Sequence, residues 1–332
     1  MQPEKGNVRA LGLSSGGLDS ILSALVLRRQ GIAVAWVAFE TPFFSAAKAR
    51  QAARMIEVPL TVRPITAVYL EMLKNPPVGY GRHMNPCMDC HALMFRLAGE
   101  MMRAVGADFL FSGEVLGQRP MSQTRQSLRY VEKHSGFDGY ILRPLSAQRL
   151  PETIPEKRGW VARAGLLGIA GRGRKEQIRL AREFGVTDYP APAGGCLLTD
   201  KNYSRRLRDL LAQRDLPAER ELELLKYGRH FRLDPDAKVV VGRSRTENEA
   251  ILGCCDPAVD VQVKIRDYPG PLALMPHGGK PAAVMLAATI CAGYSKAPKM
   301  VQAVAAEVVG PGGREVLQVI ALPPTDFKRL LI

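Results

Sequence analysis

The segment Leu11-Gly12-Leu13-Ser14-Ser15-Gly16-Gly17-Leu18-Asp19-Ser20 decides how the first part of the chain folds. It follows an apolar run over residues 8–13 and precedes an apolar-periodic run over residues 21–27. This order predicts a strand, a glycine-rich turn and a helix. Gly16 and Gly17 permit a tight turn and a close approach of the backbone to a ligand.

The chemistry of this turn suits an anion with several oxygens, most simply a phosphate group. Ser14, Ser15 and Ser20 supply hydroxyl donors. The helix that follows directs its free N–H groups and the positive end of its dipole at the turn. No Gly-Lys-Ser/Thr sequence closes the turn, so it is not a Walker loop. The alternative is a turn that only caps the helix, with Asp19 as a first-turn acid.

Strand-like and helix-like segments alternate over residues 8–145, which predicts an α/β fold with a doubly wound parallel sheet and helices on both faces. The predicted strands cover residues 8–13, 32–39, 60–65, 108–112 and 140–142. The predicted helices cover residues 19–29, 45–56, 67–73, 88–105 and 121–133. Ligands bind beyond the carboxyl ends of such strands. We therefore expect the glycine-rich turn, residues 40–44 and residues 112–119 to lie at one edge.

The remainder of the chain predicts a long excursion and a second domain. Residues 146–173 are rich in Pro, Gly and Arg and should pack on the sheet domain, and residues 214–220 form a polar joint. Helices are expected at residues 174–184, 203–213, 282–294 and 299–306. Strands are expected at residues 231–233, 239–241, 261–265, 272–275 and 316–321. The pattern thus predicts a first domain over residues 1–215 and a smaller α+β domain over residues 226–332.

The composition is that of an ordinary soluble protein, with 46% hydrophobic and 23% charged residues. The net charge is +14, and eight Lys or Arg against one acid lie between Lys157 and Arg182. This distribution favours a polyanionic partner with salt-dependent binding. No apolar run approaches the roughly 20 residues of a membrane span. Residues 1–5 are polar, so we expect a cytoplasmic protein with no membrane partner.

Six cysteines in such a chain indicate thiols, metal ligands or catalytic groups rather than disulfides. Cys87-Met88-Asp89-Cys90 is a CxxC at the predicted start of a helix, where the helix terminus favours the thiolate. Zinc, a redox pair, two structural cysteines and a thiolate site shared with Cys196 are the alternatives. Cys196 follows two glycines in a Pro- and Gly-rich loop. We expect Cys254, Cys255 and Cys291 to be structural.

Residues 15–20, Ser-Gly-Gly-Leu-Asp-Ser, resemble the signature Ser-Gly-Gly-x-Asp-Ser of the PP-loop ATP pyrophosphatases. The resemblance implies an enzyme that splits ATP into AMP and pyrophosphate. It makes Asp19 a Mg²⁺ contact and places Phe39 and Gly113 near the nucleotide. Arg143 either faces phosphate or forms a surface salt bridge. The residues that the resemblance assigns to the β,γ-phosphates are Ser15, Gly16, Gly17, Asp19 and Ser20.

Over residues 8–213 the chain is similar to the tRNA thiolation branch of these proteins, which includes tRNA 2-thiouridylase and 4-thiouridine synthetase. Asn85-Pro86-Cys87-Met88-Asp89-Cys90-His91 resembles the Asn-Pro-Asp-x-x-Cys-Asn pattern of the 2-thiouridylase, and Cys196 matches its second cysteine. Cys87 departs from that pattern, because the 2-thiouridylase has aspartate there. Cys87, Cys90 and Cys196 instead resemble the relatives that hold a [4Fe–4S] cluster by three cysteines.

The last part of the chain, residues 226–332, resembles the NFACT-R RNA-binding domain. The resemblance rests on Gly228-Arg229-His230-Phe231-Arg232-Leu233, Val239-Val240-Val241-Gly242-Arg243, Glu247-Asn248 and Ala292-Gly293-Tyr294-Ser295-Lys296-Ala297. It implies that tRNA is the polyanionic partner.

Together these resemblances imply an ATP-dependent tRNA sulfurtransferase, a thiouridylase that adenylates a uridine carbonyl oxygen and then replaces it with sulfur. The sulfur comes either from a persulfide on Cys196, with Cys90 resolving the disulfide, or from a [4Fe–4S] cluster on the three cysteines. The sulfur donor is another protein or free sulfide, since no rhodanese-like domain is visible. The alternatives are a PP-loop enzyme that acts on a small molecule and a non-catalytic RNA-binding protein.

Overall fold

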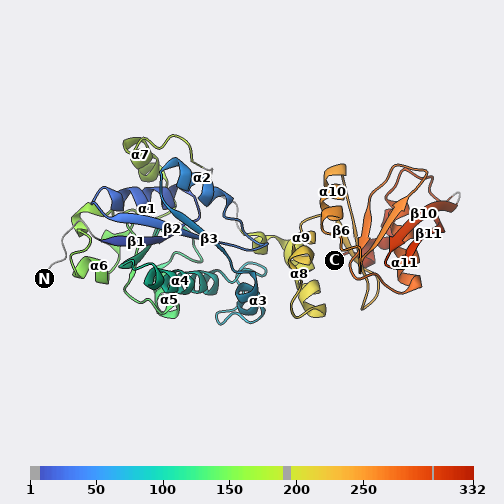
Figure 1. The fold of residues 1–332 in the computed structure, drawn as a ribbon, viewed down its shortest axis with the longest axis horizontal. Coiled ribbons are helices and arrows are strands. Elements are labelled where there is room, and N and C mark those ends of the chain that lie inside the picture. Colours follow the sequence, from blue (N-terminus) through green and yellow to red (C-terminus); the bar gives the residue numbers. More distant parts are fainter. Residues whose placement is uncertain (1–7, 190–195, 301–302) are drawn as a thin grey trace. The chain divides into compact units, whose positions relative to one another are not determined.

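The computed structural model describes residues 8–189, 196–300 and 303–332. The chain forms two compact units, Met1–Thr199 and Asp200–Ile332, each with its own sheet and buried core (Figure 1). No helix within the described ranges is both long and apolar enough to cross a membrane.

The first unit is built on a parallel sheet with the strand order β3-β2-β1-β4-β5. The strands are β1 Arg9–Leu13, β2 Ala33–Glu40, β3 Leu60–Pro64, β4 Phe109–Ser112 and β5 Ile141–Leu142. Each lies where the sequence predicts it, and the doubly wound parallel sheet is confirmed. Parallel strands that are covered on both faces are apolar throughout, and all residues of β4 are indeed buried.

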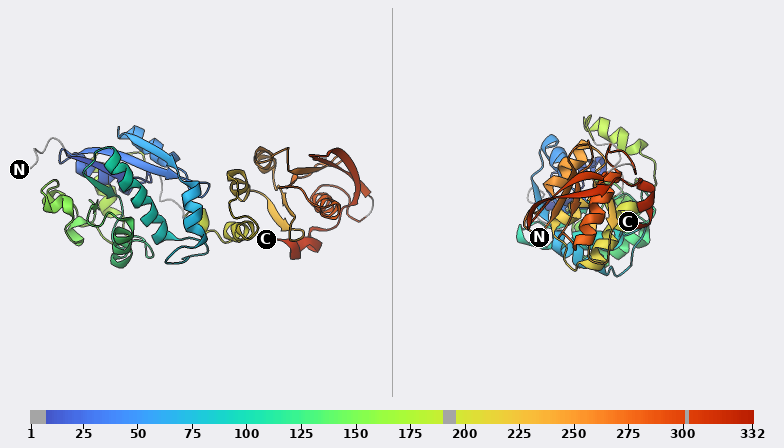
Figure 2. Two further views of the ribbon diagram at one scale, coloured as in Figure 1. Left: turned by 60° about the horizontal axis from the view of Figure 1, so that its bottom comes forward. Right: turned by 90° about the vertical axis from the view of Figure 1, so that its right-hand side faces the viewer.

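Helices cover both faces of this sheet. α1 Leu18–Arg28, α2 Ala47–Met55 and α7 Lys175–Glu183 lie on one face, and α4 Cys87–Ala104 and α5 Arg125–Ser135 lie on the other (Figure 1). The left view of Figure 2 shows α4, in teal, crossing the sheet. α3 Thr66–Lys74 packs against α4. The helices predicted for these segments are confirmed.

The core of this unit packs α1 against the sheet. Ile21 and Leu22 of α1 are 0% exposed, and they share one apolar cluster with Phe109 and Phe111 of β4. Gly12 in β1 leaves the space that the Phe111 ring fills, because a Cβ at Gly12 would lie 2.3 Å from that ring. The apolar residues on either side of the glycine-rich turn therefore build the support that carries it.

The carboxyl end of β1 is a topological switch point. The chain adds β2 and β3 on one side of β1 and then adds β4 and β5 on the other side. Gly113, which follows β4, packs there against the start of α1. A Cβ at Gly113 would lie 2.5 Å from both the carbonyl carbon of Asp19 and the backbone nitrogen of Ser20. Glycine thus permits the loop after β4 to touch the backbone of α1.

Residues 146–173 pack on the first unit and contain η1 Ala147–Arg149, α6 Ile154–Lys157 and η2 Arg163–Gly165. Leu167 N donates a hydrogen bond to Pro144 O (2.9 Å), and Ile169 N donates one to Leu145 O (2.8 Å). Leu166 is buried in the core of the unit. The predicted excursion is therefore confirmed, and it leads the chain back to α7, which contacts α1.

The second unit contains an antiparallel sheet with the strand order β11-β10-β8-β9-β7-β6. The strands are β6 Arg229–Arg232, β7 Lys238–Val241, β8 Val261–Ile265, β9 Ala273–Met275, β10 Ala303–Gly310 and β11 Gly313–Ile320. Its helical elements are α8 Lys201–Gln213, α9 Glu219–Leu224, α10 Arg245–Gly253, α11 Pro281–Gly293 and η4 Pro324–Leu330. α11 covers the sheet, and Cys291 lies in that core at 0% exposure. The predicted α+β class is confirmed.

The helix predicted over residues 299–306 is wrong, because Ala303–Gly310 form strand β10. Val304, Ala306 and Val308 are buried while the residues between them are not, which is the period of two that a strand requires. Pairing with β8 and β11 decides the conformation of this segment. Helix α10 was not predicted.

Helix α8 belongs to the second unit, whereas the sequence analysis placed it in a first domain over residues 1–215. Arg206 of α8 donates hydrogen bonds to Leu225 O (2.9 Å) and Gly228 O (3.0 Å). Asp209 of α8 forms an ion pair with Arg232 of β6 (2.7 Å). These contacts fasten α8 to the second sheet, so this unit begins before the predicted joint.

The contact of Gly113 with α1 predicts the effect of Gly113→Ala. The added Cβ would overlap backbone atoms, which cannot move like a side chain, so we expect the free energy of unfolding of the first unit to fall by about 1–3 kcal/mol. Urea unfolding measures this change. Gly173→Ala is the matched control, because a Cβ at Gly173 would meet nothing within 4 Å. Equal stability of the two variants would contradict the close contact.

Candidate active site

The turn between β1 and α1 is held by its own hydroxyl groups. Gly16 N donates to Ser14 Oγ (3.1 Å), and Ser15 N donates to Ser20 Oγ (3.3 Å). Gly16 has a φ of 72°, and a Cβ there would lie 2.2 Å from a backbone carbon at the start of α2. No side chain in the described part of the chain caps α1 at Gly17. The first N–H groups of α1 therefore face the turn, as an anion site requires.

Asp19 lies half-buried at this turn. Gln118 Nε2 donates to its Oδ2 (3.1 Å), whereas its Oδ1 is enclosed and has no hydrogen-bond partner among the described residues. Burial raises the pKa of Asp19, while Gln118 and the guanidinium of Arg174 oppose that rise. The unpaired oxygen fits the predicted Mg²⁺ contact, because Mg²⁺ is usually held by one or two carboxylates together with substrate phosphates.

Helix α7 adds a group that the sequence analysis did not assign. Gln177 is 0% exposed, and neither its Oε1 nor its Nε2 has a hydrogen-bond partner within the described ranges. Its amide, Arg174 and Arg119 all lower the pKa of Asp19. A buried amide whose hydrogen bonds are not fully satisfied is costly, so Gln177 and Asp19 together mark a polar site beside the turn. The sequence hinted at it only through the basic block that leads into α7.

Two further residues predicted near the nucleotide lie at the same sheet. Gly113 contacts the backbone of Asp19 and Ser20 and so lies directly beside the turn. Phe39 lies in β2, next to its last residue, and is buried. Contact of either residue with a nucleotide stays a prediction.

The structure brings the three predicted cysteines together. Cys87 and Cys90 lie in the first turns of α4, and Cys196 directly precedes η3 Leu197–Thr199. Burial raises the pKa of the Cys90 thiol, and the nearby thiols of Cys87 and Cys196 raise it further. The pKa of Cys196 is likewise raised by burial and by the nearby Cys87. Met84 N donates to Leu198 O (3.2 Å), which ties η3 to the segment that leads into α4.

Burial keeps these thiols protonated. It raises the pKa of Cys90 to about 12 and that of Cys196 to about 11, and it also raises the pKa of Cys87. A hydrogen bond with the Tyr69 hydroxyl offsets only part of the rise in the pKa of Cys90. The expectation that the helix terminus favours a thiolate is therefore wrong, because desolvation outweighs the helix dipole.

Tyr69 of α3 is an aromatic member of this site that the sequence analysis did not identify. It is 0% exposed, and the rings of Phe43 and Phe44 lie 5.5 and 5.3 Å from its own, centroid to centroid. The thiol of Cys196 donates to Phe43 O (3.8 Å). Burial and the neighbouring thiols raise the pKa of Tyr69 well above its ordinary value. The sulfur atoms thus lie in apolar, aromatic surroundings.

The thiols do not form a ready ligand set for a metal. Within residues 8–189, 196–300 and 303–332, no group of three or more His, Cys, Asp or Glu side chains is arranged to hold a metal ion. Within those residues, Cys87, Cys90 and Cys196 therefore do not form a site for a single metal ion such as zinc. The cluster stays a prediction from the sequence resemblance alone.

Arg143 lies in a buried salt bridge, so the predicted surface salt bridge is wrong, while contact of Arg143 with phosphate stays a prediction. Its side chain is 1% exposed, its Nε donates to Glu114 Oε2 (2.9 Å), and it also pairs with Glu132. His91 Nδ1 lies 2.9 Å from Glu114 Oε1. Burial raises the pKa of Glu114, but Arg143 and His91 more than offset it and leave that pKa at about 2. This buried network fixes the loop after β4 to α4 and α5.

Arg119 influences both the thiols and the glycine-rich turn between β1 and α1, which we call the phosphate-type turn. Its guanidinium lowers the pKa of Asp19 at the turn and the pKa of Cys87 at the start of α4. It is exposed, and it follows Gln118, which holds Asp19. One cation at the end of the sheet is therefore near enough to both groups of residues to oppose, in part, the rise in pKa that burial causes.

Comparison with known families agrees with the resemblances seen in the sequence. Residues 6–150 match the family described as "Thiamine biosynthesis protein (ThiI)", and residues 228–330 match the "NFACT protein RNA binding domain". The resemblance to the PP-loop proteins of tRNA thiolation and to NFACT RNA-binding domains is confirmed.

Two curated relatives extend this comparison. The chain is 26% identical over 155 residues to a "Probable tRNA sulfurtransferase" of Oceanobacillus iheyensis, which covers 44% of this chain and 37% of the relative. It is 25% identical over 240 residues to "tRNA-specific 2-thiouridylase MnmA 2" of a Thermoanaerobacter species, which covers 65% of this chain and 62% of the relative. The chain thus spans less than two thirds of the length of either relative.

Among solved structures, a "4-thiouridine synthetase - RNA complex with bound ATP" is 20% identical and covers 54% of this chain and 41% of that chain. Its TM-score of 0.39 is too low for the likeness to bear on the function of this chain.

The raised thiol pKa values predict the pH dependence of cysteine alkylation. With a pKa of about 11, the Cys196 thiol is protonated at neutral pH, so its alkylation rate should rise roughly tenfold per pH unit from pH 7 to pH 10. Mass spectrometry of iodoacetamide-modified peptides measures each cysteine separately. The urea-unfolded protein is the control, and its rates should level off above the ordinary thiol pKa of about 8.5. A plateau for folded Cys196 below pH 9 would contradict its burial.

Proposed function

We propose that this protein is an ATP-dependent tRNA sulfurtransferase that adenylates a uridine carbonyl oxygen and then replaces it with sulfur, releasing AMP and pyrophosphate. The observation that carries the proposal is that one unit contains both a polar turn with the half-buried Asp19 and a group of three cysteines, with Arg119 near enough to influence Asp19 and Cys87. An activating site and a sulfur site at one edge are what such a two-step reaction requires.

The turn would perform the activating step. A uridine carbonyl oxygen is a poor leaving group, whereas AMP is a good one. The N–H groups at the start of α1 and the hydroxyls of Ser15 and Ser20 would hold the β,γ-phosphates of ATP. Mg²⁺ held at Asp19 would supply positive charge against the phosphates. Gln177 and Arg119 would hold the remaining phosphate oxygens.

The cysteines would perform the sulfur transfer. The terminal sulfur of a persulfide on Cys196 attacks the activated carbon, and AMP leaves with the former carbonyl oxygen. Cys90 then gives up its proton and attacks the Cys196 sulfur, which releases the thiouridine and forms a Cys90–Cys196 disulfide. To restore the persulfide, either an external dithiol reduces this disulfide and a donor protein transfers persulfide sulfur to the Cys196 thiol, or free sulfide attacks the disulfide at the Cys196 sulfur and Cys90 leaves as a thiol.

The charge distribution supports RNA as the molecule that presents the uridine. Arg172, Lys175, Arg179 and Arg182 are exposed on α7 and the segment before it. α7 also carries Gln177, so this basic face adjoins the phosphate-type turn. Contacts of this kind would make binding of tRNA weaken steeply with salt.

The cluster route of sulfur delivery has its own test. Anaerobic reconstitution with iron and sulfide, followed by a visible spectrum, reports any cluster directly. A colourless protein that still thiolates tRNA would support the persulfide route. A coloured protein that loses its colour in the Cys87→Ala variant would overturn the persulfide route and restore the cluster.

The activating step is tested by incubating the protein with ATP and measuring AMP and pyrophosphate with and without tRNA. We expect both products only when tRNA is present, because the uridine oxygen is the acceptor of the AMP group. Formation of AMP with a small molecule alone would favour a PP-loop enzyme of small-molecule metabolism. Absence of AMP under all conditions would leave only RNA binding.

The sulfur step predicts the effect of Cys196→Ala. Removal of the sulfur carrier should lower tRNA thiolation by about 100-fold or more, while tRNA affinity stays unchanged. Mass spectrometry of tRNA nucleosides and a filter-binding assay measure the two properties. Cys255→Ala, in the second unit, is the matched control and should retain activity. Retained thiolation in Cys196→Ala would remove this residue from the site.

A further inference from the structure

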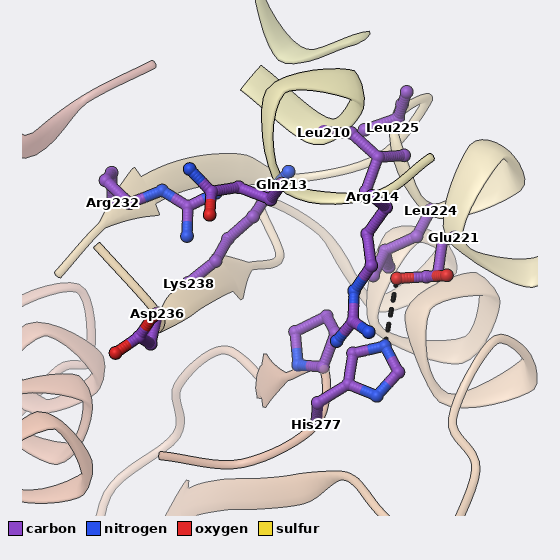
Figure 3. Close-up of a pocket in the computed structure, with 11 residues that line it drawn as sticks. Leu210, Gln213, Arg214, Glu221, Leu224, Leu225, Arg232, Asp236, Lys238 and His277 are labelled. Atoms are coloured by element: carbon purple, nitrogen blue, oxygen red, sulfur yellow. Dashed lines mark hydrogen bonds and ion pairs between the residues drawn. The ribbon is translucent and has the colours of Figure 1, made fainter. Parts of the chain in front are cut away.

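The second unit contains a cavity of about 280 Å³ that the proposed reaction does not use. It lies between α8, α9 and the strands β6 and β7, and His277 of the loop after β9 closes one side (Figure 3). Pockets for small molecules measure about 300–1,000 Å³, so this volume suits one small, compact ligand.

Positive charge is concentrated on one wall of the cavity. Arg232 and Lys238 line it from neighbouring strands and share a single counter-ion, Asp209 of α8. Arg232 takes the short contacts, with Nε and Nη2 at 3.1 and 2.7 Å from the two carboxylate oxygens. Lys238 Nζ is left 3.5 Å from Asp209 Oδ2, beyond the about 2.7–3.2 Å of a good N–H···O bond.

Lys238 is therefore a buried cation that shares its counter-ion with Arg232. Its side chain is 10% exposed, and burial together with Arg232 and Arg206 lowers its pKa to about 8, although Asp209 opposes that change. Two buried cations share one carboxylate, and burying charge that is not fully compensated costs free energy. A second anion in the cavity would balance the remaining positive charge.

The carboxylates around the cavity do not take that role. Glu221 is engaged at both oxygens, since Ala218 N donates to Oε2 (2.9 Å) and His277 Nε2 lies 2.9 Å from Oε1. Figure 3 shows this His277–Glu221 contact as a dashed line. Asp236 lies at the exposed rim. Glu221 therefore does not serve as a counter-ion for Lys238 on the opposite wall of the cavity.

The other side of the cavity offers flat and apolar surfaces. Arg214, the residue that ends α8, extends its guanidinium toward the His277 ring (Figure 3). Leu210, Leu224 and Pro276 supply apolar contacts. Guanidinium and imidazole planes stack on nucleobases, and apolar walls exclude water from them.

We propose that this cavity binds one phosphorylated nucleotide, with its phosphate at Lys238 and its base between Arg214 and His277. The nucleotide is either part of an RNA chain or a free mononucleotide, which share the same chemistry. Only the RNA source rests on the proposed function, because the cavity itself belongs to the second unit and does not depend on catalysis.

Calorimetric titration of the full chain with UMP tests this proposal. We expect Lys238→Met to weaken UMP binding about tenfold or more and Arg214→Gln to weaken it several-fold, since one removes the phosphate contact and the other the stacking plane. Lys264→Met, at an exposed lysine of β8, is the control and should bind as the unaltered protein does. Thermal unfolding confirms that each variant is folded.

Two further probes identify the ligand class and its source. Uridine and inorganic phosphate should each bind at least about tenfold more weakly than UMP, because each makes only one half of the contacts. A fluorescent single-stranded oligouridylate then separates the two sources. Weaker binding of both UMP and the oligonucleotide to Lys238→Met supports a nucleotide of RNA, and weaker binding of UMP alone supports a free mononucleotide.

Three results would overturn the nucleotide site. They are UMP affinity that Lys238→Met and Arg214→Gln leave unchanged, phosphate binding as tight as that of UMP, and oligonucleotide binding that needs Lys238 although UMP does not bind. AMP and pyrophosphate formation in the same Lys238→Met variant reports on the proposed reaction separately, so failure of one hypothesis does not decide the other.

Discussion

The close backbone contact of Gly113 with Asp19 and Ser20 is the constraint on which the site depends. This contact occurs at the switch point of the parallel sheet, where the neighbouring strands β1 and β4 end and the loops that follow them begin. Since no Cβ separates the two segments, Gln118 can reach Asp19 and hold one of its oxygens. The second oxygen, the buried amide of Gln177 and the start of α1 then face the same space. The need for a residue without a Cβ at position 113 is therefore linked to a polar site beside an apolar core.

The same loop is also linked to the helix that carries Cys87 and Cys90. Glu114, one residue after Gly113, is fixed by Arg143 and by His91, which follows Cys90 on α4. The His91–Glu114 contact thus joins α4 to the loop after β4, and the buried Arg143–Glu114 ion pair holds that loop, because loss of either partner would leave uncompensated charge. The thiols themselves lie in an apolar, aromatic environment that keeps them protonated. Such surroundings protect resting thiols, and they suit a reaction that begins only when tRNA and a sulfur donor are both bound.

The sequence predicted the first unit well because its signals are local. Each strand is a short apolar run between helical patterns, and the glycine-rich turn needs only its own residues and the next helix. Prediction failed where long-range contacts decide. Ala303–Gly310 is rich in Ala and Val, and pairing with two strands makes it β10 rather than a helix. Arg143 is a typical phosphate ligand in isolation, but it pairs with the buried Glu114, 29 residues away in the sequence. Gln177 and Tyr69 carry no local sign of function, and burial, which reversed the expected thiol pKa shift, cannot be read from a CxxC motif.

The central claim is that the turn and the cysteines act in succession on one uridine. It is tested most directly by incubating Cys196→Ala with tRNA and ATP labelled at the α-phosphate, and then counting label on the isolated tRNA. Our account predicts that AMP accumulates on tRNA in this variant, because activation proceeds while sulfur transfer is blocked, and that Asp19→Ala yields no labelled tRNA. Equal absence of label from both variants, while the unaltered protein forms AMP with tRNA, would contradict a shared site.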